Sequence, residues 1–265
     1  MAKEDFKGII FISDVHFGAN PESDQEILQD LNSLIHLCIT ERYRLIVLGD
    51  LFDYWMEFDD YYPEFGEPIL DLFERINKFQ KTLYITGNHD NWGGKVLSEK
   101  GFDVESEYRI LDISNHKVLL LHGDGLKSKH FKFPRPFFHR ILRNELFVSL
   151  YKFIAGRRIG LNLMKWFSEK SRDENVDTSQ TKSKLKNWAT NYLTRLDAKA
   201  SIIIAGHTHQ SKLQITPSGL YINIGRFNTD RTLLIYTNRC FKLVTWDGEN
   251  SQIVLTEKMY CLENK

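Results

Sequence analysis

Residues 45–53 have the sequence LIVLGDLFD, in which four apolar residues lead directly to Gly49 and Asp50, with Asp53 three residues later. A short apolar run that is rich in β-branched residues and Leu is typical of a strand buried on both faces. A Gly-Asp pair directly after such a strand places a carboxylate where the chain leaves the sheet. The same arrangement recurs along the chain, and it decides the fold.

Four other apolar runs end in polar motifs, at residues 8–12, 83–85, 118–121 and 202–205. The motifs that follow them are Asp14-Val-His16, Gly87-Asn88-His89-Asp90, His122-Gly-Asp124 and Gly206-His207-Thr-His209. Apolar residues recur at helical spacing at 24–40 and 68–79. These two segments separate the first three of the five runs in chain order. This alternation of strands and helices predicts a largely parallel sheet, with the site beyond the carboxyl ends of its strands.

The polar motifs together predict a metal site. Each motif alone is compatible with an ordinary turn or a surface histidine, but all five occur in order, each after a predicted buried strand. Carboxylate oxygens, an amide oxygen and neutral imidazoles suit Mn, Fe, Zn or Mg. Seven such side chains can surround two ions if one carboxylate bridges them, and two ions can together activate a water molecule.

Composition excludes several other classes of protein. The 265-residue chain has no apolar run of the roughly 18 residues that a membrane span needs. The N-terminal segment lacks the features of a signal peptide, which favours a cytoplasmic protein. The three cysteines, Cys38, Cys240 and Cys261, are odd in number and far apart in sequence, so they are expected to be free thiols rather than a disulfide or a metal site.

The segment after residue 125 differs from the rest. We expect residues 1–125 and 188–265 to form the main domain and residues 126–187 to form a helical cap, with helices at 138–154 and 159–170. A further helix is expected at 181–196, and strands at 212–216, 220–224, 232–236, 241–246 and 252–256. Residues 126–187 carry 15 Lys and Arg against 5 Asp and Glu, although the whole chain has 35 of each. A basic, aromatic-rich insertion of this kind suggests an anionic partner.

The order of motifs, DxH, GDxxD, GNHD, H and GHxH, resembles the calcineurin-like metallophosphoesterase family over about residues 8–125 and 200–230. The resemblance implies an α/β fold, a β-sandwich flanked by helices in four layers. It also implies two divalent metal ions bridged by Asp50. The implied ligands are Asp14, His16, Asp50 and His209 for one ion, and Asp50, Asn88, His122 and His207 for the other.

The resemblance also implies catalytic roles. A hydroxide that bridges the two ions would attack phosphorus in line, and His89 would protonate the leaving oxygen or stabilise developing charge. Asp90 could orient His89, as carboxylates orient imidazoles elsewhere. Asp53 is assigned to the shell behind the ligands, and the alternative is that it merely begins a helix.

Within the family, residues 49–55, 122–126 and 167–175 look most like the UDP-2,3-diacylglucosamine hydrolase branch of lipid A synthesis. That similarity implies Mn as the metal and a phosphorylated lipid or small molecule as substrate. The implied substrate contacts are Asn88, His89, Asp124, Ser171 and Arg172. The basic, aromatic cap suits an anionic membrane surface and acyl chains, which favours a location peripheral to the inner membrane. The alternative is that the cap aromatics pack against the main domain.

Two rival functions stay open. His89 and Gly225-Arg226-Phe227-Asn228 stand where the branch carries Arg and a Trp-His motif, so another phosphodiesterase or phosphatase activity is an alternative. The second rival is a non-catalytic scaffold, although such a scaffold would be free to lose ligands and every expected ligand position is filled here. Neither a nucleic-acid partner nor an obligate protein partner is predicted.

Overall fold

The computed structural model describes residues 6–59, 61–126, 141, 144–175, 179–248, 250 and 252–262, with the backbone alone at 145, 167, 170–175, 179–182 and 254–257. The helices are α1 (Pro21–Thr40), α2 (Glu67–Asn77), α3 (Lys95–Glu99), α5 (Glu145–Asn175) and α6 (Ser179–Leu193), with a short 3-10 helix η1 (Glu64–Gly66). The strands are β1 (Gly8–Ile12), β2 (Tyr43–Leu48), β3 (Leu83–Ile85), β4 (Asp103–Glu105), β5 (Tyr108–Ile113), β6 (His116–Leu121), β7 (Ile202–Ala205), β8 (Lys212–Thr216), β9 (Gly219–Asn223), β10 (Thr232–Thr237), β11 (Cys240–Asp247) and β12 (Gln252–Cys261).

The strands form two sheets. One has seven strands in the order β12-β11-β10-β1-β2-β3-β4, and the other has five in the order β5-β6-β7-β9-β8. Strands β1 to β4 are parallel, as are β6, β7 and β9, which agrees with the predicted strand–helix alternation. Strands β10, β11 and β12 pair antiparallel because short turns join them. Strands β4 and β5 and helix α3 were not expected from the sequence.

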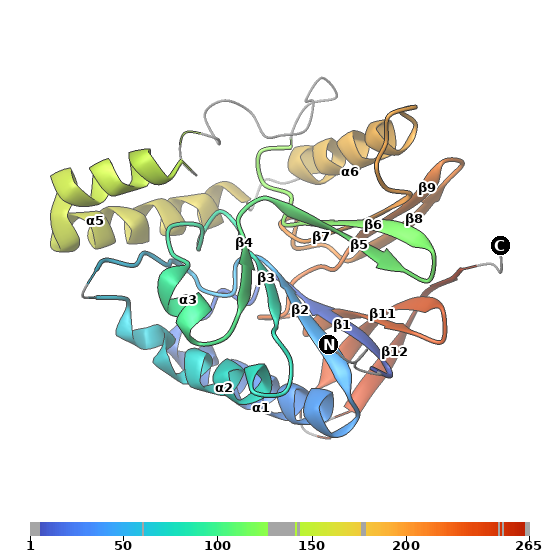
Figure 1. The fold of residues 1–265 in the computed structure, drawn as a ribbon, viewed down its shortest axis with the longest axis horizontal. Coiled ribbons are helices and arrows are strands. Elements are labelled where there is room, and N and C mark those ends of the chain that lie inside the picture. The colour runs from blue at the N-terminus through green and yellow to red at the C-terminus, as the bar shows by residue number, and fades with distance from the viewer. Residues whose placement is uncertain are drawn as a thin grey trace.

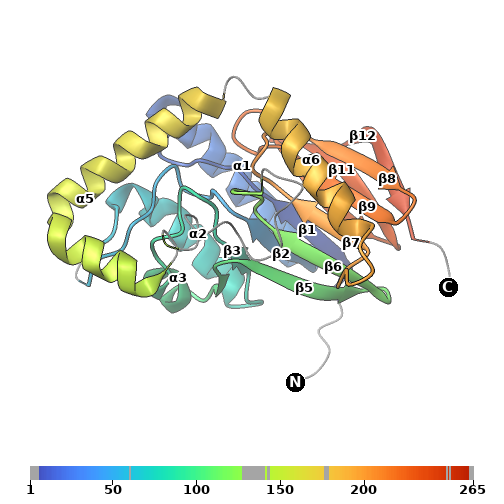
Figure 2. The ribbon, with the colours of Figure 1, turned by 90° about the horizontal axis from the view of Figure 1, so that it is seen from above.

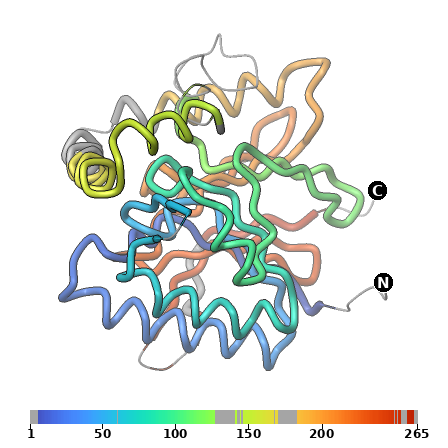
Figure 3. The backbone as a smooth tube through the Cα atoms, turned by 60° about the vertical axis from the view of Figure 1, so that its left-hand side comes forward, coloured from blue at the N-terminus to red at the C-terminus, as the bar shows by residue number. Residues whose placement is uncertain are grey.

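Alternating side chains on the buried strands create the layers. Ile10 and Ile12 of β1 share a core with α1 and α2, whereas Phe11 points the other way, into the core between the two sheets. Leu120 of β6 belongs to that inter-sheet core, and its neighbour Leu121 packs on the α6 side. The result is helix, sheet, sheet and helix in four layers, with α1 and α2 on one outside and α6 on the other (Figures 1 and 3). The predicted fold class is confirmed.

Helix α1 begins where local chemistry favours a helix start. Asn20 has an extended backbone, and its side-chain oxygen accepts a hydrogen bond of 3.1 Å from the backbone N–H of Glu22. Pro21 follows at the first helical position, where no backbone N–H is needed. The observed helix therefore starts three residues before the predicted range of 24–40.

Helix α5 consists of two arms that meet at Gly156, whose φ of 64° and ψ of 173° are not helical. A small apolar cluster that includes Met56, Trp92 and Met164 packs the helix against the main body. The two arms extend beside the sheets and form a corner, as Figure 2 shows. The break lies between the two helices predicted at 138–154 and 159–170, although residues 127–140 and 142–143 lie outside the described part of the chain.

Helix α6 packs on the five-stranded sheet. Its side chains Leu185, Trp188 and Ala189 share a core with Leu119 and Leu121 of β6. The predicted end of the cap at residue 187 therefore falls inside a helix that covers the main domain. No helix in the described part of the chain is long and apolar enough to cross a bilayer.

The expectation of three free thiols is wrong for two of them. Cys240 and Cys261 lie directly opposite each other in the β11–β12 hairpin, and a disulfide joins them. They are 21 residues apart in sequence, and the register of the hairpin, which sequence spacing does not reveal, brings them together. Cys38 is free and buried, as expected.

Candidate metal centre

The first group of candidate ligands lies at the carboxyl end of β1. His16 Nε2 is 3.2 Å from His209 Nε2, and His209 Nε2 is 3.2 Å from Asp14 Oδ1. His16 Nε2 lies 3.9 Å from the same oxygen of Asp14. These three side chains, two from the β1 loop and one from the β7 loop, thus direct their donor atoms at a common point.

The second group lies at the carboxyl ends of β2, β3, β6 and β7. His122 Nε2 is 3.1 Å from Asp50 Oδ2 and 3.2 Å from Asn88 Oδ1. The ring of His207 lies at an angle to that of His122, with the ring centres 5.1 Å apart. The ligand atoms of Asp50, His122 and His207 all lie within 4.8 Å of one another.

Asp50 connects the two groups. Its Oδ2 atom lies 3.1 Å from His122 Nε2 and 3.8 Å from His16 Nε2. The sequence prediction of a carboxylate shared by two neighbouring sites is compatible with this position. The seven predicted ligands, which come from five loops, are therefore gathered where the carboxyl edges of the two sheets meet.

The protonation pattern of these side chains fits cations. His122 Nδ1 lies 2.8 Å from the carbonyl oxygen of Leu48, so Nδ1 carries a proton, and Nε2 is the nitrogen that can present a lone pair to a metal ion. Nε2 faces two acceptors, the side-chain oxygens of Asp50 and Asn88. Acceptors that converge without a donor repel one another unless a cation or a proton lies among them. Oxygen and imidazole donors are those that Mn, Fe, Zn and Mg accept, so the residues present fit the two implied ions.

The pKa is lowered for two of the candidate imidazoles and raised for another. Burial and a neighbouring histidine lower the pKa of His16 to about 4 and that of His207 to about 3, so both rings are neutral and can ligate. Burial also acts to lower the pKa of His122, but the charge and hydrogen bond of Asp50 outweigh it and raise that pKa to about 10. A cation beside Asp50 would neutralise the cause of this rise.

The backbone at the site adopts an unusual conformation. Five of the seven candidate ligands have positive φ angles between 46° and 69°, and they are Asp14, His16, Asp50, His207 and His209. Such angles are uncommon for residues other than glycine and gather at functional sites, where the surrounding structure enforces them. The enforcing contacts include hydrogen bonds from the backbone N–H groups of residues 14–16 to the carbonyl oxygens of residues 49 and 50.

Gly87 shows why this motif needs a glycine. A Cβ atom at this position would lie 2.0 Å from Asp50 Oδ1, which is much closer than any real contact. The absence of a side chain therefore creates the space that the shared carboxylate occupies. The β3 loop also donates to that carboxylate, through the backbone N–H of His89 at 3.0 Å.

The carboxylate of Asp90 binds backbone N–H groups and a tyrosine hydroxyl. It accepts hydrogen bonds of 2.7 Å from the backbone N–H groups of Leu51 and Gly87, and a further one from the hydroxyl of Tyr84. Burial and the charge of Asp50 raise the pKa of Asp90 to about 6. The carboxylate thus ties together the two loops that carry Asp50 and Asn88.

His89 is oriented instead by residues that the sequence analysis did not select for that role. Its Nδ1 atom lies 2.7 Å from the carbonyl oxygen of Asp53 and 3.0 Å from the hydroxyl of Ser168, on α5. The carboxylate of Asp53 lies near His16, with Oδ1 3.8 Å from His16 Nδ1. A carboxylate behind a ligating imidazole is a common supporting arrangement, and this role for Asp53 stays a prediction.

The three remaining candidates are Asp124, Ser171 and Arg172. Asp124 is buried, and its charge acts on both His122 and His207, so it lies beside the second group of ligands. Ser171 and Arg172 lie in α5, but their side chains lie outside the described part of the structure. Tyr84 and Ser168 were missed. The spacing of Met164 and Ser168 signals a shared helix face, but it does not reveal which loop that face contacts.

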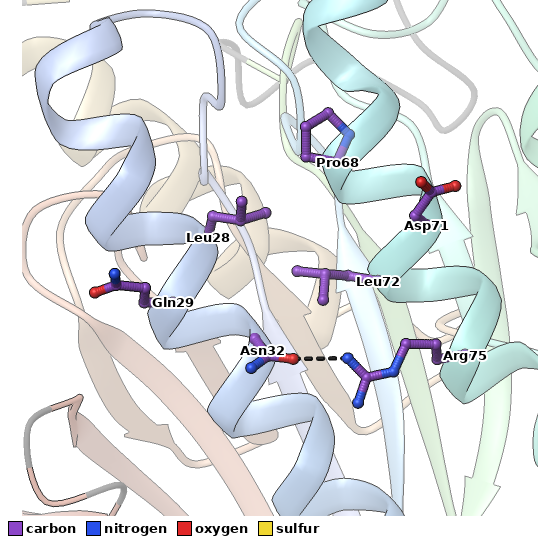
Figure 4. A pocket seen from close by; sticks show the side chains of 7 residues that line it. All are labelled: Leu28, Gln29, Asn32, Pro68, Asp71, Leu72 and Arg75. Atoms are coloured by element: carbon purple, nitrogen blue, oxygen red, sulfur yellow. Dashed lines mark hydrogen bonds between the residues drawn. The ribbon is translucent and has the colours of Figure 1, made fainter.

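A pocket of 360 Å³ lies elsewhere, between α1 and α2 (Figure 4). It is lined by Leu28, Gln29, Asn32, Pro68, Asp71, Leu72 and Arg75. A hydrogen bond of 2.7 Å from Arg75 to Asn32 spans it. None of the candidate ligands lines this pocket, so it is separate from the metal centre.

Comparison with known proteins identifies the class of this protein. A model of the calcineurin-like phosphoesterases matches residues 8–211, which is more than half of the chain. The chain therefore belongs to the calcineurin-like phosphoesterase family, as its motifs predicted. It is a phosphoesterase of a family that uses divalent metal ions.

Several individual proteins are similar to this chain. The chain is 26% identical to the UDP-2,3-diacylglucosamine hydrolase of Hamiltonella defensa over 253 residues, which cover 93% of this chain and 91% of that protein. It is also 26% identical to the protein of the same name from Vibrio atlanticus over 251 residues, 91% of this chain and 98% of the relative. Among solved structures, Yfce, a phosphoesterase from E. coli, has a TM-score of 0.51 at 13% identity, covering 97% of this chain and 100% of its own. This last likeness concerns the fold alone.

Proposed function

We propose that this protein is a hydrolase with two divalent metal ions that cleaves a diphosphate bond in a lipid-linked nucleotide of the UDP-2,3-diacylglucosamine type. The observation that carries the proposal is the convergence of acceptor atoms around Asp50, where His122 Nε2, Asn88 Oδ1 and Asp50 Oδ2 face one another. The names of the similar bacterial proteins support the choice of substrate.

Each candidate residue has a role in this proposal. Asp14, His16 and His209 would hold one ion, Asn88, His122 and His207 would hold the other, and Asp50 would contribute to both. Two bound ions of this kind supply Lewis acidity and lower the pKa of a water molecule. His89 would lie near the reacting phosphate, since its ring centre is 4.8 Å from that of the candidate ligand His16, and it would give a proton to the leaving oxygen. Asn88, Asp124, Ser171 and Arg172 are proposed substrate contacts.

Asp90 and Asp53 act on the loops and rings around the ions. The proposed role of Asp90 is to hold the β2 and β3 loops at a fixed separation through the N–H groups of Leu51 and Gly87. Asp53 is proposed to support His16 and His89 from behind. Mn is the proposed physiological metal because of the similarity to the UDP-2,3-diacylglucosamine hydrolases, and Fe, Zn and Mg are the alternatives that the same oxygen and imidazole ligands suit.

Helix α5 supports a lipid substrate at a membrane surface. In the first arm, Leu150 is exposed, and Phe153 and Ile154 are 88% and 73% exposed. Arg158 and Lys165 are also exposed on this helix. Exposed apolar and basic side chains together suit acyl chains and anionic headgroups. The proposed cap, residues 126–187, would then bind the lipid at the periphery of the inner membrane, without a nucleic-acid or obligate protein partner.

The test is product analysis with UDP-2,3-diacylglucosamine in detergent micelles plus Mn. Release of UMP and the diacylated sugar phosphate is the expected result, and Asp50→Asn is the negative control. A p-nitrophenyl phosphodiester is assayed in parallel. Turnover of this aryl ester without turnover of the lipid nucleotide would reject the lipid substrate and favour another phosphodiester. No turnover of either with two ions bound would reject the hydrolase.

A further inference from the structure

The second arm of α5 presents one narrow face to the main body. Gly160, Met164 and Ser168 recur at every fourth position and are buried, whereas Asn162 and Lys165 are exposed. Residues four apart lie on the same side of a helix, one turn above the other. Because Met164 packs in the cluster with Met56 and Trp92, the next turn carries Ser168 over the candidate centre.

Ser168 reaches two groups of the site at once. Its hydroxyl, on a side chain only 5% exposed, lies 3.0 Å from His89 Nδ1. The same oxygen lies 2.7 Å from the carbonyl oxygen of Asp53 and 2.9 Å from Asp53 Oδ2. Ser168 therefore joins the helix outside the sheets to the side chain proposed to act on the leaving group.

Counting protons fixes the direction of these hydrogen bonds. A hydroxyl has one proton and can also accept, whereas both oxygens of Asp53 can only accept. The Ser168 proton goes to Asp53, so the Ser168 oxygen is left to accept from His89 Nδ1–H, which the Asp53 carbonyl also receives at 2.7 Å. Nδ1 is then the protonated nitrogen that faces the protein, and Nε2 is left to face the candidate metal centre.

We propose that Ser168 is a positioning residue for His89, and this inference rests on the proposed hydrolase function. Its hydroxyl fixes the rotation of the imidazole and keeps Asp53 behind it. In the step that this geometry serves, the P–O bond to the leaving group breaks, its electron pair stays on the leaving oxygen, and that oxygen takes the proton of Nε2. His89 is left with the Nδ1 proton that Ser168 and Asp53 hold.

The structure also explains why Asp90 does not serve this purpose. Its carboxylate is occupied by the backbone of Leu51 and Gly87 and by Tyr84. The orienting group therefore comes from a helix 79 residues away in sequence rather than from the adjacent residue. This link makes the position of α5 part of the catalytic geometry.

The first experiment compares leaving groups. Ser168→Ala is assayed on two aryl methyl phosphodiesters, one that releases p-nitrophenol and one that releases phenol. Because phenol is the poorer leaving group and needs the proton, we expect kcat to fall by about 10- to 100-fold for the phenyl ester, with KM unchanged. The p-nitrophenyl ester should lose less than about threefold, since it needs little proton transfer. Ser168→Thr, which keeps the hydroxyl, should restore the phenyl ester, and Asn162→Ala on the exposed face is the matched control. Equal losses on both esters, or no loss, would overturn the positioning role.

The second experiment does not depend on turnover. In the Zn-loaded protein labelled with ¹⁵N-histidine, the Nδ1–H signal of His89 is assigned by its absence in His89→Gln. Ser168→Ala should shift this signal and speed its exchange with water by about tenfold or more, and Asn162→Ala should leave it unchanged. An unchanged signal in Ser168→Ala rejects the inference. A wild-type enzyme without any turnover would reject the proposed function instead, and the NMR result would still decide the role of Ser168.

Discussion

The candidate metal centre and helix α5 lie side by side but depend on different interactions. The candidate ligands follow strands that are buried on both faces, and hydrogen bonds between neighbouring loops hold their backbones. Helix α5 is attached through a small apolar cluster, and its first arm leaves large apolar side chains exposed. The sheets therefore fix the positions of the candidate ligands, whereas the helix leaves part of its surface exposed. Such a division lets a substrate surface vary while the reactive groups stay fixed.

The substitution with the largest expected effect alters the candidate centre and leaves helix α5 unchanged. Asp50→Asn removes one of the charges that hold both candidate ions, so bound metal should fall below two ions per chain. Turnover of every ester should fall by more than about 100-fold, because both ions stabilise the reacting phosphate. Metal analysis and circular dichroism measure the loss and the retained fold. Asp71→Asn, an equal change at an exposed site on α2, is the control, and full activity in Asp50→Asn would contradict the proposed bridging role.

The next change alters helix α5 and leaves the candidate centre unchanged. Phe153→Asp with Ile154→Asp alters two exposed side chains of the first arm without opening a core. Each large apolar side chain contributes about 1.5–3 kcal/mol when it is buried, so binding to anionic vesicles should weaken by about tenfold or more per residue. Activity on a water-soluble aryl ester should stay within about twofold. Leu196→Asp, at a fully exposed position after α6, is the control. Unchanged sedimentation with vesicles would show that the arm does not bind lipid.

A third change concerns a hairpin remote from both regions. Cys240→Ser with Cys261→Ser removes the disulfide that closes the β11–β12 hairpin, and chain-entropy arguments give a loss of about 3 kcal/mol of unfolding free energy. Metal content should not change. Urea unfolding measures the stability, and thiol titration of the unfolded wild type without reductant should detect Cys38 alone. Three titratable thiols under those conditions would disprove the bond.

The smallest expected effect loosens a tie beneath the centre. Tyr84→Phe removes the hydroxyl that donates to Asp90 and leaves that buried carboxylate with its backbone donors. The unfolding free energy should fall by about 1–3 kcal/mol, with a smaller effect on turnover than Asp50→Asn. Urea unfolding compared with Tyr260→Phe, at a partly exposed edge position, isolates the contribution of burial. A stability equal to the wild type would mean that the Tyr84 hydroxyl contributes nothing.

The residues of the candidate centre were easier to select from the sequence than the residues around them, for a physical reason. Runs such as Leu45 to Leu48 are apolar at every position because both faces are buried, and such runs can be read without knowing their neighbours. The partners of Asp90 and Ser168 depend on which loops and helices meet in three dimensions. The same limit applies to Cys240 and Cys261, since a hairpin register decides their pairing. The short β4 and the half-exposed β5 lack a continuous apolar run, so they gave no comparable signal.

The corner at Gly156 has a consequence for how this chain tolerates insertions and deletions. Residues added to the first arm, before the corner, change its length but leave the rotation of the second arm as it is. A single residue inserted between Gly160 and Ser168 would turn the serine by about 100° around the helix axis and carry its hydroxyl away from the imidazole. Length variation among related chains should therefore be common on one side of Gly156 and rare on the other.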